Sequence, residues 1–284
     1  MNTDHSRPFT TNREEPDSVL PMEPHLVALD VDGTILTHDG ELRAATRDAI
    51  RAVAAAGHHI VISTGRSVVA TTPVLEMLDL SHGWAVCSNG AVTLELDPAE
   101  PHGYRIDETV TFDPREALTL VMEHAPDILV AVEEVGVGFK VAKPYPEGVL
   151  MGEQVVVPFE QLVDTPTTRV SFHDPEAASE DFLELVERIG LHGVSYSVGY
   201  TAWLDLAPEG VSKGSALELV RRRLGIEPHL TFAAGDQRND LEMLRWAARG
   251  VAMGDAPPEV VAAADEQTGT VYEDGLADAL RPLI

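Results

Sequence analysis

The sequence predicts an α/β protein whose core is a doubly wound, mostly parallel sheet. Short apolar runs alternate with amphipathic stretches of helical periodicity near both ends of the 284-residue chain, as in βαβ units. Between these two blocks, from residue 92 to 197, Val-rich segments are separated by Pro and Gly, which indicates an inserted α+β domain built on antiparallel strands. We therefore expect a discontinuous core, 25–91 and 198–284, with the insertion at 92–197.

The first block follows a polar, Pro-containing segment, residues 1–24, which we expect to be a flexible tail. A buried strand over 25–29 precedes a helix that stops at Gly57. Strands at 58–63 and 84–88 then flank a helix near 67–78, whose regularity Pro73 complicates.

The second block shows the same alternation of predicted strands and helices. A helix capped by Ser212 and ended by Gly225 is followed by a strand over 230–235 and a helix that begins at Asp240. A strand at 250–253 and helices at 257–265 and 274–283 complete the chain. In the insertion we expect strands near 108–113, 127–143, 153–163 and 167–174, and a helix over 177–190.

Charge and composition exclude several classes of function. The formal net charge is -27, from 20 basic and 47 acidic side chains, so the mean field repels nucleic acid and anionic membranes. A small anionic substrate needs a local cation to overcome that field. The single cysteine, Cys87, excludes an internal disulfide and a Cys-based zinc site. No window has the length of a signal peptide core or a membrane span, and we expect a cytoplasmic protein, monomeric or homodimeric.

Polar motifs follow the predicted core strands. They are DVDGT (30–34), STGR (63–66), SNGA (88–91) and GDQRND (235–240), while SKG (212–214) opens a helix. Ligands of doubly wound sheets bind outside the carboxyl ends of the strands. These motifs should therefore converge on one edge of the sheet.

Asp30 and Asp32 would repel each other at a strand end unless a cation lies between them. An Asx turn or helix cap is the competing interpretation, and an EF-hand is excluded because its later ligands are missing. Asp236 and Asp240 follow the strand at 230–235, where Asp236 or Asn239 could simply cap the next helix. Together with Asp30 across the sheet edge, they supply the oxygen ligands that Mg2+ prefers.

The phosphate-binding candidates also have two interpretations. Ser63 and Thr64 could be ordinary N-caps, or their hydroxyls and nearby backbone N–H groups could bind an anion. Lys213 could be a solvated helix lysine. In the first turn of a helix, however, its charge opposes the helix dipole, so a bound anion explains it better.

Taken in order, DVDGT, STGR, SKG and GDQRND resemble the four motifs of the haloacid dehalogenase superfamily of phosphohydrolases. The insertion resembles the C2 cap of its Cof-like subgroup, as do CSNGAV, LAPEGVSKGSAL and VAMGDAPPEVVAAAD. The resemblance covers nearly all of the chain from His25 onward. It implies a Rossmann-like core with a cap that closes over the active site.

The resemblance also implies roles for individual residues. Asp30 would attack phosphorus to give an aspartyl phosphate, and Asp32 would protonate the leaving oxygen and then activate water. Mg2+ would bind the Asp30 carboxylate, the Asp32 backbone carbonyl and Asp236, with Asp240 acting through water. The phosphoryl oxygens would be held by Ser63, Thr64, Lys213 and Asn239, while Gly33 lets the backbone approach; Arg66 and Asn89 would line the substrate site.

Two departures from the subgroup bear on substrate preference. GDA stands at 254–256 where GNA is frequent, and the following helix lacks a lysine. In the insertion, six side chains could touch a leaving group: Lys143, Tyr145, Arg169, His173, Tyr200 and Trp203. Cys87 is expected to be a buried small residue, and His58 and His59 point to opposite faces of a strand and cannot share a metal.

The sequence thus predicts a Mg2+-dependent phosphatase of small phosphorylated metabolites, with a sugar phosphate as first choice. A phosphomutase of the same superfamily and a non-catalytic phosphosugar-binding protein are the alternatives. A response-regulator receiver domain is disfavoured because its phosphoaccepting Asp would follow the third strand, where this chain has SNG. G-x-G-x-x-G after the first strand and G-x-x-x-x-G-K-[ST] are both absent.

Overall fold

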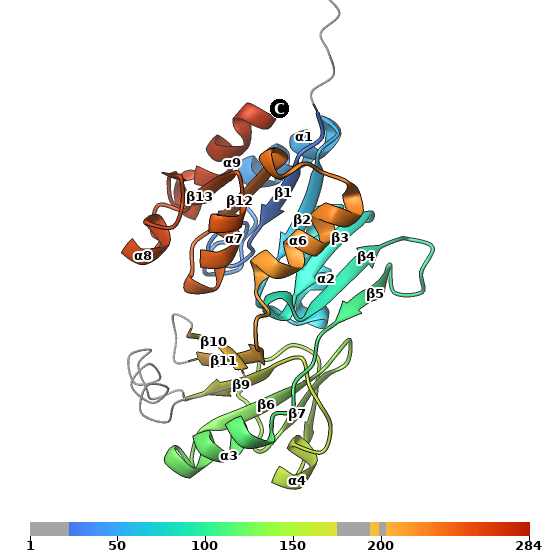
Figure 1. Ribbon diagram of the computed structural model, residues 1–284, viewed down its shortest axis with the longest axis vertical. Coiled ribbons are helices and arrows are strands. Elements are labelled where there is room, and N and C mark those ends of the chain that lie inside the picture. The colour runs from blue at the N-terminus through green and yellow to red at the C-terminus, as the bar shows by residue number, and fades with distance from the viewer. Residues whose placement is uncertain (1–22, 175–193, 199–202) are drawn as a thin grey trace, which may run out of the picture.

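Two β-sheets organise the protein, and each belongs to a different part of the chain (Figure 1). The computed structural model describes residues 23–174, 194–198 and 203–284. The upper part in Figure 1 is an eight-stranded core sheet covered by helices, and the lower part is a six-stranded sheet with helices on one side. The prediction of an α/β core with an inserted α+β domain is confirmed.

The core sheet is parallel except at one edge. Its strand order is β14-β13-β12-β1-β2-β3-β4-β5, with β4 and β5 antiparallel to their neighbours. The strands are β1 (Leu26–Leu29), β2 (His59–Ser63), β3 (Gly83–Cys87), β4 (Val92–Leu96), β5 (Tyr104–Thr109), β12 (Thr231–Gly235), β13 (Arg249–Ala252) and β14 (Glu266–Gln267).

Helices cover both faces of the core sheet, as alternating side chains require. Val27 and Leu29 of β1 join a buried cluster with α1, α2 and α9, whereas Leu26 and Ala28 join a second cluster with α6, α7 and α8. Apolar runs without polar alternation are typical of such doubly covered strands. The helices are α1 (Ala44–Ala55), α2 (Val68–Met77), α6 (Lys213–Leu224), α7 (Leu241–Trp246), α8 (Pro258–Val261) and α9 (Gly275–Leu280).

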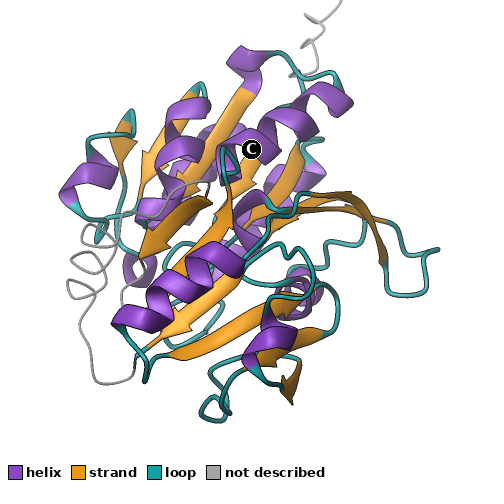
Figure 2. Cartoon of the chain, turned by 60° about the horizontal axis from the view of Figure 1, so that its bottom comes forward, coloured by secondary structure: helices purple, strands orange, loops and turns teal. Residues whose placement is uncertain are grey.

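The inserted sheet has its own core. Its order is β10-β11-β9-β6-β7-β8, antiparallel except for the parallel pair β7 and β8. Figure 2 brings this part of the chain forward and shows its strands together with its helices. Its elements are α3 (Arg115–His124), β6 (Leu129–Glu134), β7 (Gly138–Val141), β8 (Glu153–Val156), α4 (Phe159–Leu162), β9 (Val170–His173), β10 (Val194–Val198) and β11 (Trp203–Pro208). Leu118 and Val121 of α3 pack against Phe172 and Leu204 of this sheet.

Strand pairing differs from the expected boundaries of the insertion at both ends. The expected insertion spans 92–197, but β4 and β5 extend the core sheet beyond β3. β11 was expected in the core, yet it pairs with β9 and β10 of the inserted sheet. A Val-rich composition indicates β structure, but it does not indicate which of two sheets a strand joins.

Most expected elements are present where the sequence placed them. Ser212 caps α6 by accepting from the Ser215 N–H, and Gly225 ends the helix in the left-handed conformation with φ of 67°. Helices α3 and α4 were not predicted. The helix expected at 177–190 and residues 1–22 of the tail expected at 1–24 lie outside the described residues. No helix in the described part of the chain is long and apolar enough to cross a membrane.

Gly225→Ala tests the end of α6. A methyl group has open space there but must adopt a positive φ, so we expect a loss of about 1 kcal/mol of unfolding free energy. A thermal unfolding scan should show a midpoint lower by about 2–4 °C with unchanged ligand binding. An unchanged midpoint would mean that the left-handed turn costs alanine nothing here.

Candidate active site

The strand-end motifs meet at one edge of the core sheet. Leu29, the last residue of β1, lies opposite Ile62 of β2 and Ala234 of β12. The residues that follow them, Asp30, Ser63 and Gly235, therefore lie side by side at the carboxyl ends of three neighbouring strands. The parallel register alone explains why residues far apart in sequence form one site.

A buried lysine connects two of these motifs. The Lys213 side chain has no exposed surface, and its Nζ donates to Asp30 Oδ1 and to Asp240 Oδ1, each at 2.6 Å. Lys213 is the first residue of α6, directly after the Ser212 cap. A bound anion is the predicted partner of this ammonium group, and within the protein two carboxylates contact it.

Asp240 is held by both of its carboxylate oxygens. Oδ1 accepts from Lys213, and Oδ2 accepts from the backbone N–H groups of Asp236 and Gln237 at 2.9 Å each. Gly235 makes room for it, because a Cβ there would lie 2.5 Å from Asp240 Cγ. These hydrogen bonds hold the loop after β12 in place. Because both carboxylate oxygens already accept hydrogen bonds, Asp240 is a poor direct ligand for a metal ion.

Asp236 faces the loop after β1. It is almost fully buried, Oδ1 accepts from Thr34 Oγ1 at 3.3 Å, and Oδ2 accepts from Gln237 Nε2 at 2.8 Å. Gly33 has φ of +85°, and any side chain there would collide with the Asp236 carboxylate. The glycine therefore allows the turn after β1 to approach Asp236.

Three buried carboxyl groups surround one ammonium group. Oxygen atoms of Asp30, Asp236 and Asp240 lie within 4.8 Å of one another, so with Lys213 the fully ionised cluster carries a net charge of -2. Burial and the neighbouring Asp240 raise the pKa of Asp30 well above its usual range, and the same two causes raise the pKa of Asp236 to about 7. A divalent cation would neutralise this cluster, and oxygen donors in this number fit a hard metal ion.

The carboxylate of Asp32 is paired with Arg66, a residue that the sequence places in the lining of the substrate site. Arg66 Nε and Nη2 donate to its two oxygens at 2.8 and 2.5 Å. The Asp32 side chain is 55% exposed, whereas that of Asp30 is 6% exposed. The two aspartates therefore occupy different environments, one inside the charge cluster and one at the cavity wall.

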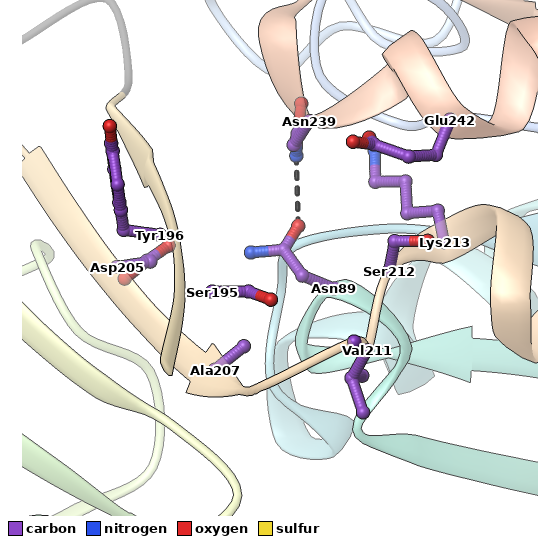
Figure 3. Close-up of a pocket in the computed structure, with 11 residues that line it drawn as sticks. Asn89, Ser195, Tyr196, Asp205, Ala207, Val211, Ser212, Lys213, Asn239 and Glu242 are labelled. Carbon is purple, nitrogen blue, oxygen red and sulfur yellow. Dashed lines mark hydrogen bonds between the residues drawn. The ribbon is translucent and has the colours of Figure 1, made fainter. Parts of the chain in front are cut away.

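Loops after β2 and β3 complete the site. The Asn239 amide donates to Asn89 Oδ1 at 2.9 Å, the contact drawn in Figure 3. Asn89 has φ of 55°, and its backbone N–H donates to the Thr64 carbonyl. The Ser63 hydroxyl is fully buried and has no hydrogen-bond partner among the described residues, so its capacity to donate is unused within the protein.

A cavity of about 640 Å³ lies between the core and the insertion. From the core it is lined by residues that the sequence analysis named, among them Asp30, Asp32, Thr64, Arg66 and Asn239. From the insertion it receives Phe139, Arg169, Ser171, Trp203 and Asp205, together with residues 148–151. A smaller cavity of about 190 Å³, beyond Asn239, is lined by Asn89 and Lys213 (Figure 3).

The candidates in the insertion divide into groups. Arg169 and Trp203 line the large cavity, and the His173 ring stacks on Trp203 at 4.7 Å. Tyr145 is buried and donates to the Ser171 carbonyl, while Lys143 makes an exposed ion pair with Asp127. Tyr200 lies outside the described residues.

Several contributors were not singled out from the sequence. Thr34 and Gln237 lie inside the quoted motifs, so the motifs themselves could have indicated them. Asp205 and Ser171 had no local signal. The expectation for Cys87 is confirmed: the thiol is buried, and burial raises its pKa to about 12, which removes it as a nucleophile.

Comparisons with known proteins agree with this geometry. The family model described as haloacid dehalogenase-like hydrolase matches residues 27–280. Protein YxeH of Bacillus subtilis (strain 168) is 30% identical over 91% of this chain and 98% of its own length. Phosphatase YwpJ of the same strain is 27% identical over 91% of this chain and 99% of its own.

Solved structures share the same architecture. A phosphatase of the haloalkanoate superfamily from Bacteroides thetaiotaomicron has a TM-score of 0.74 and 26% identity, covering 94% of this chain and 98% of that one. A sugar phosphatase of subclass IIB has a TM-score of 0.76 and 24% identity, covering 92% and 100%. The core and the inserted mixed sheet are thus those of the predicted fold, and the chain belongs to the haloacid dehalogenase-like hydrolase family.

Proposed function

We propose that the protein is a Mg2+-dependent phosphatase that hydrolyses small phosphate monoesters through an aspartyl phosphate on Asp30. The observation that carries this proposal is the position of Asp30, which is buried against Lys213 at one oxygen and borders the 640 Å³ cavity. The family and the relatives named as phosphatases support it. The field of a chain with net charge -27 makes local cations necessary for any phosphorylated substrate.

The proposed metal site uses groups that already converge. The carboxylates of Asp30 and Asp236 and the backbone carbonyl of Asp32 would hold Mg2+, with Asp240 contributing through water because both of its oxygens are engaged. When bound, the ion would neutralise the carboxylate cluster and the charge of the transferring phosphoryl group.

The proposed chemistry divides the work between the two aspartates. An Asp30 oxygen forms a bond to phosphorus, the bond from phosphorus to the leaving oxygen breaks, and that oxygen takes a proton from the Asp32 carboxyl. Water then attacks phosphorus, gives its proton to Asp32 and releases the Asp30 carboxylate with inorganic phosphate. In its bidentate contact with Arg66 both oxygens of Asp32 accept, so Arg66 holds the carboxylate form. To act as the acid, Asp32 must leave this contact and carry a proton.

Donors for the phosphoryl oxygens surround the proposed reaction centre. They would be the hydroxyls of Ser63 and Thr64, the amide of Asn239 and the ammonium of Lys213, while Gly33 lets the backbone approach. The unpartnered Ser63 hydroxyl supports this assignment. Such donors stabilise the charge that develops in the transition state more than the charge of the ground state.

A sugar phosphate is our proposed substrate. One relative has a substrate in its name: YcsE of Bacillus subtilis (strain 168), 28% identical over 90% of this chain and 94% of its own length, is a 5-amino-6-(5-phospho-D-ribitylamino)uracil phosphatase. The cavity offers Trp203, Ser171 and Asp205 to a hydroxyl-rich leaving group. A cytoplasmic location and a monomeric or homodimeric state stay predictions.

The first experiment is a panel of phosphate monoesters assayed for phosphate release. We expect turnover with Mg2+, loss on chelation, and a loss of at least about 10³-fold for Asp30→Asn, because the amide cannot attack phosphorus. Asp48→Asn, an exposed aspartate of α1, is the matched control. Release that survives both chelation and Asp30→Asn would reject the mechanism. Transfer of phosphate between two hydroxyls of one sugar would indicate a phosphomutase, and binding without turnover a non-catalytic binding protein.

The pKa values predict how the metal stabilises the fold. Asp30 and Asp236 have raised pKa values in the folded protein, about 7 for Asp236. Each carboxyl therefore stabilises the fold without metal at low pH, and this contribution is lost as the pH rises through the folded pKa. Mg2+ competes with these protons, so the rise in unfolding midpoint that Mg2+ produces should be larger at pH 8 than at pH 5.5. Asp236→Asn should abolish the difference. An equal rise at both pH values would contradict this site.

A further inference from the structure

A second buried carboxylate lies where the insertion meets the core. Glu133 is in β6 of the insertion, and its side chain is 1% exposed. Both of its oxygens accept from the Ser88 hydroxyl of the core, at 2.9 and 2.7 Å, and Oε2 also accepts from Thr168 Oγ1 at 2.9 Å. The Ser88 contact crosses from the core to the insertion, and the Thr168 contact fixes the Glu133 carboxylate within the insertion.

The core side of this contact is strained. Ser88 and Asn89 both have positive φ, 50° and 55°, a conformation that costs residues with a side chain about 1–2 kcal/mol each. The turn is held because the Ser88 N–H donates to the Arg66 carbonyl and the Asn89 N–H donates to the Thr64 carbonyl. The Glu133 contact therefore joins the insertion to the loops that carry Thr64, Arg66 and Asn89.

Glu133 also faces Arg169. Oε2 lies 3.7 Å from Arg169 Nε, which has no hydrogen-bond partner among the described residues, and Arg169 Nη1 donates to the Gly65 carbonyl of the core. The guanidinium covers the Phe139 ring, with Cζ 5.4 Å from its centroid. The insertion thereby contributes a cation to the cavity wall facing the core loops.

Two carboxylates compete for that cation. Asp205 Oδ2 lies 4.0 Å from Arg169 Nη1, and Asp205 Oδ1 accepts from Ser171. Asp205 lines the cavity, whereas Glu133 does not. Glu133 balances the charge of the Arg169 guanidinium from the side away from the cavity. The Asp205 carboxylate then stays available to accept a hydrogen bond from a ligand. Without the charge of Glu133, Arg169 would be drawn to Asp205 and both would be lost to a substrate.

We propose that Arg169 and Asp205 bind the hydroxyl groups of the leaving alcohol and that Glu133 is a positioning residue that keeps Arg169 in place for this contact. A guanidinium donates and a carboxylate accepts, which together match a hydroxyl-bearing leaving group. The proposal rests on the phosphatase function proposed above and names the residues that select the leaving group.

The test is a double-mutant cycle with Glu133→Gln and Arg169→Met, using glucose 6-phosphate and p-nitrophenyl phosphate as probes. Gln keeps the volume of Glu133 and an acceptor for Ser88 but removes the charge. We expect either substitution to lower kcat/KM for glucose 6-phosphate roughly tenfold, mainly through KM, and the double variant to be no worse than Arg169→Met. p-Nitrophenyl phosphate, which has no hydroxyls on its leaving group, should change less than about twofold.

Controls separate this role from a structural one. Asp164→Asn, which removes an exposed partner of Lys140 in the insertion, should leave both substrates unaffected. Equal losses for both probes, or effects of Glu133→Gln and Arg169→Met that multiply, would overturn the proposal. The same cycle measured as Kd for glucose 6-phosphate in an Asp30→Asn background decides the inference even if no monoester is turned over, an outcome that would reject only the proposed function.

Discussion

The site depends on one buried ammonium group held between two carboxylates. Lys213 bridges Asp30 at the end of β1 and Asp240 after β12, with all three side chains almost fully buried. Removing one partner of a buried ion pair costs about 3–5 kcal/mol, because the remaining charge is left without compensation. Other features follow from this constraint: the start of α6 must reach the sheet edge, and Gly235 must leave room for Asp240.

That constraint leaves the cluster incompletely neutralised. Three carboxyl groups against one ammonium group give a negative pocket. The pKa values of Asp30 and Asp236 are raised first by burial and then by the neighbouring Asp240. The strained turn at Ser88 and Asn89 and the unpartnered hydroxyl of Ser63 lie in the neighbouring loops. Costs of this kind are typical of sites arranged for a ligand, because the ligand supplies the missing partner.

The sequence predicts well what local chemistry determines. Ser212 and Gly225 set the ends of α6, and the apolar runs of β1, β2 and β12 require a sheet covered on both faces. The motif residues then converge because parallel strands end together. Partners distant in sequence were not predictable in this way: Arg66 with Asp32, and Glu133 with Ser88, depend on how loops cross between elements. The same holds for β4, β5 and β11, whose composition is compatible with either sheet.

The central claim, that Asp30 carries the phosphoryl group, can be tested by chemical trapping. Turnover is quenched with borohydride, which reduces an aspartyl phosphate to homoserine, and the peptide that contains residues 26–36 is analysed by mass spectrometry. We expect homoserine at position 30 only when both substrate and Mg2+ are present. Turnover without reduction at position 30, or reduction at another aspartate, would contradict it.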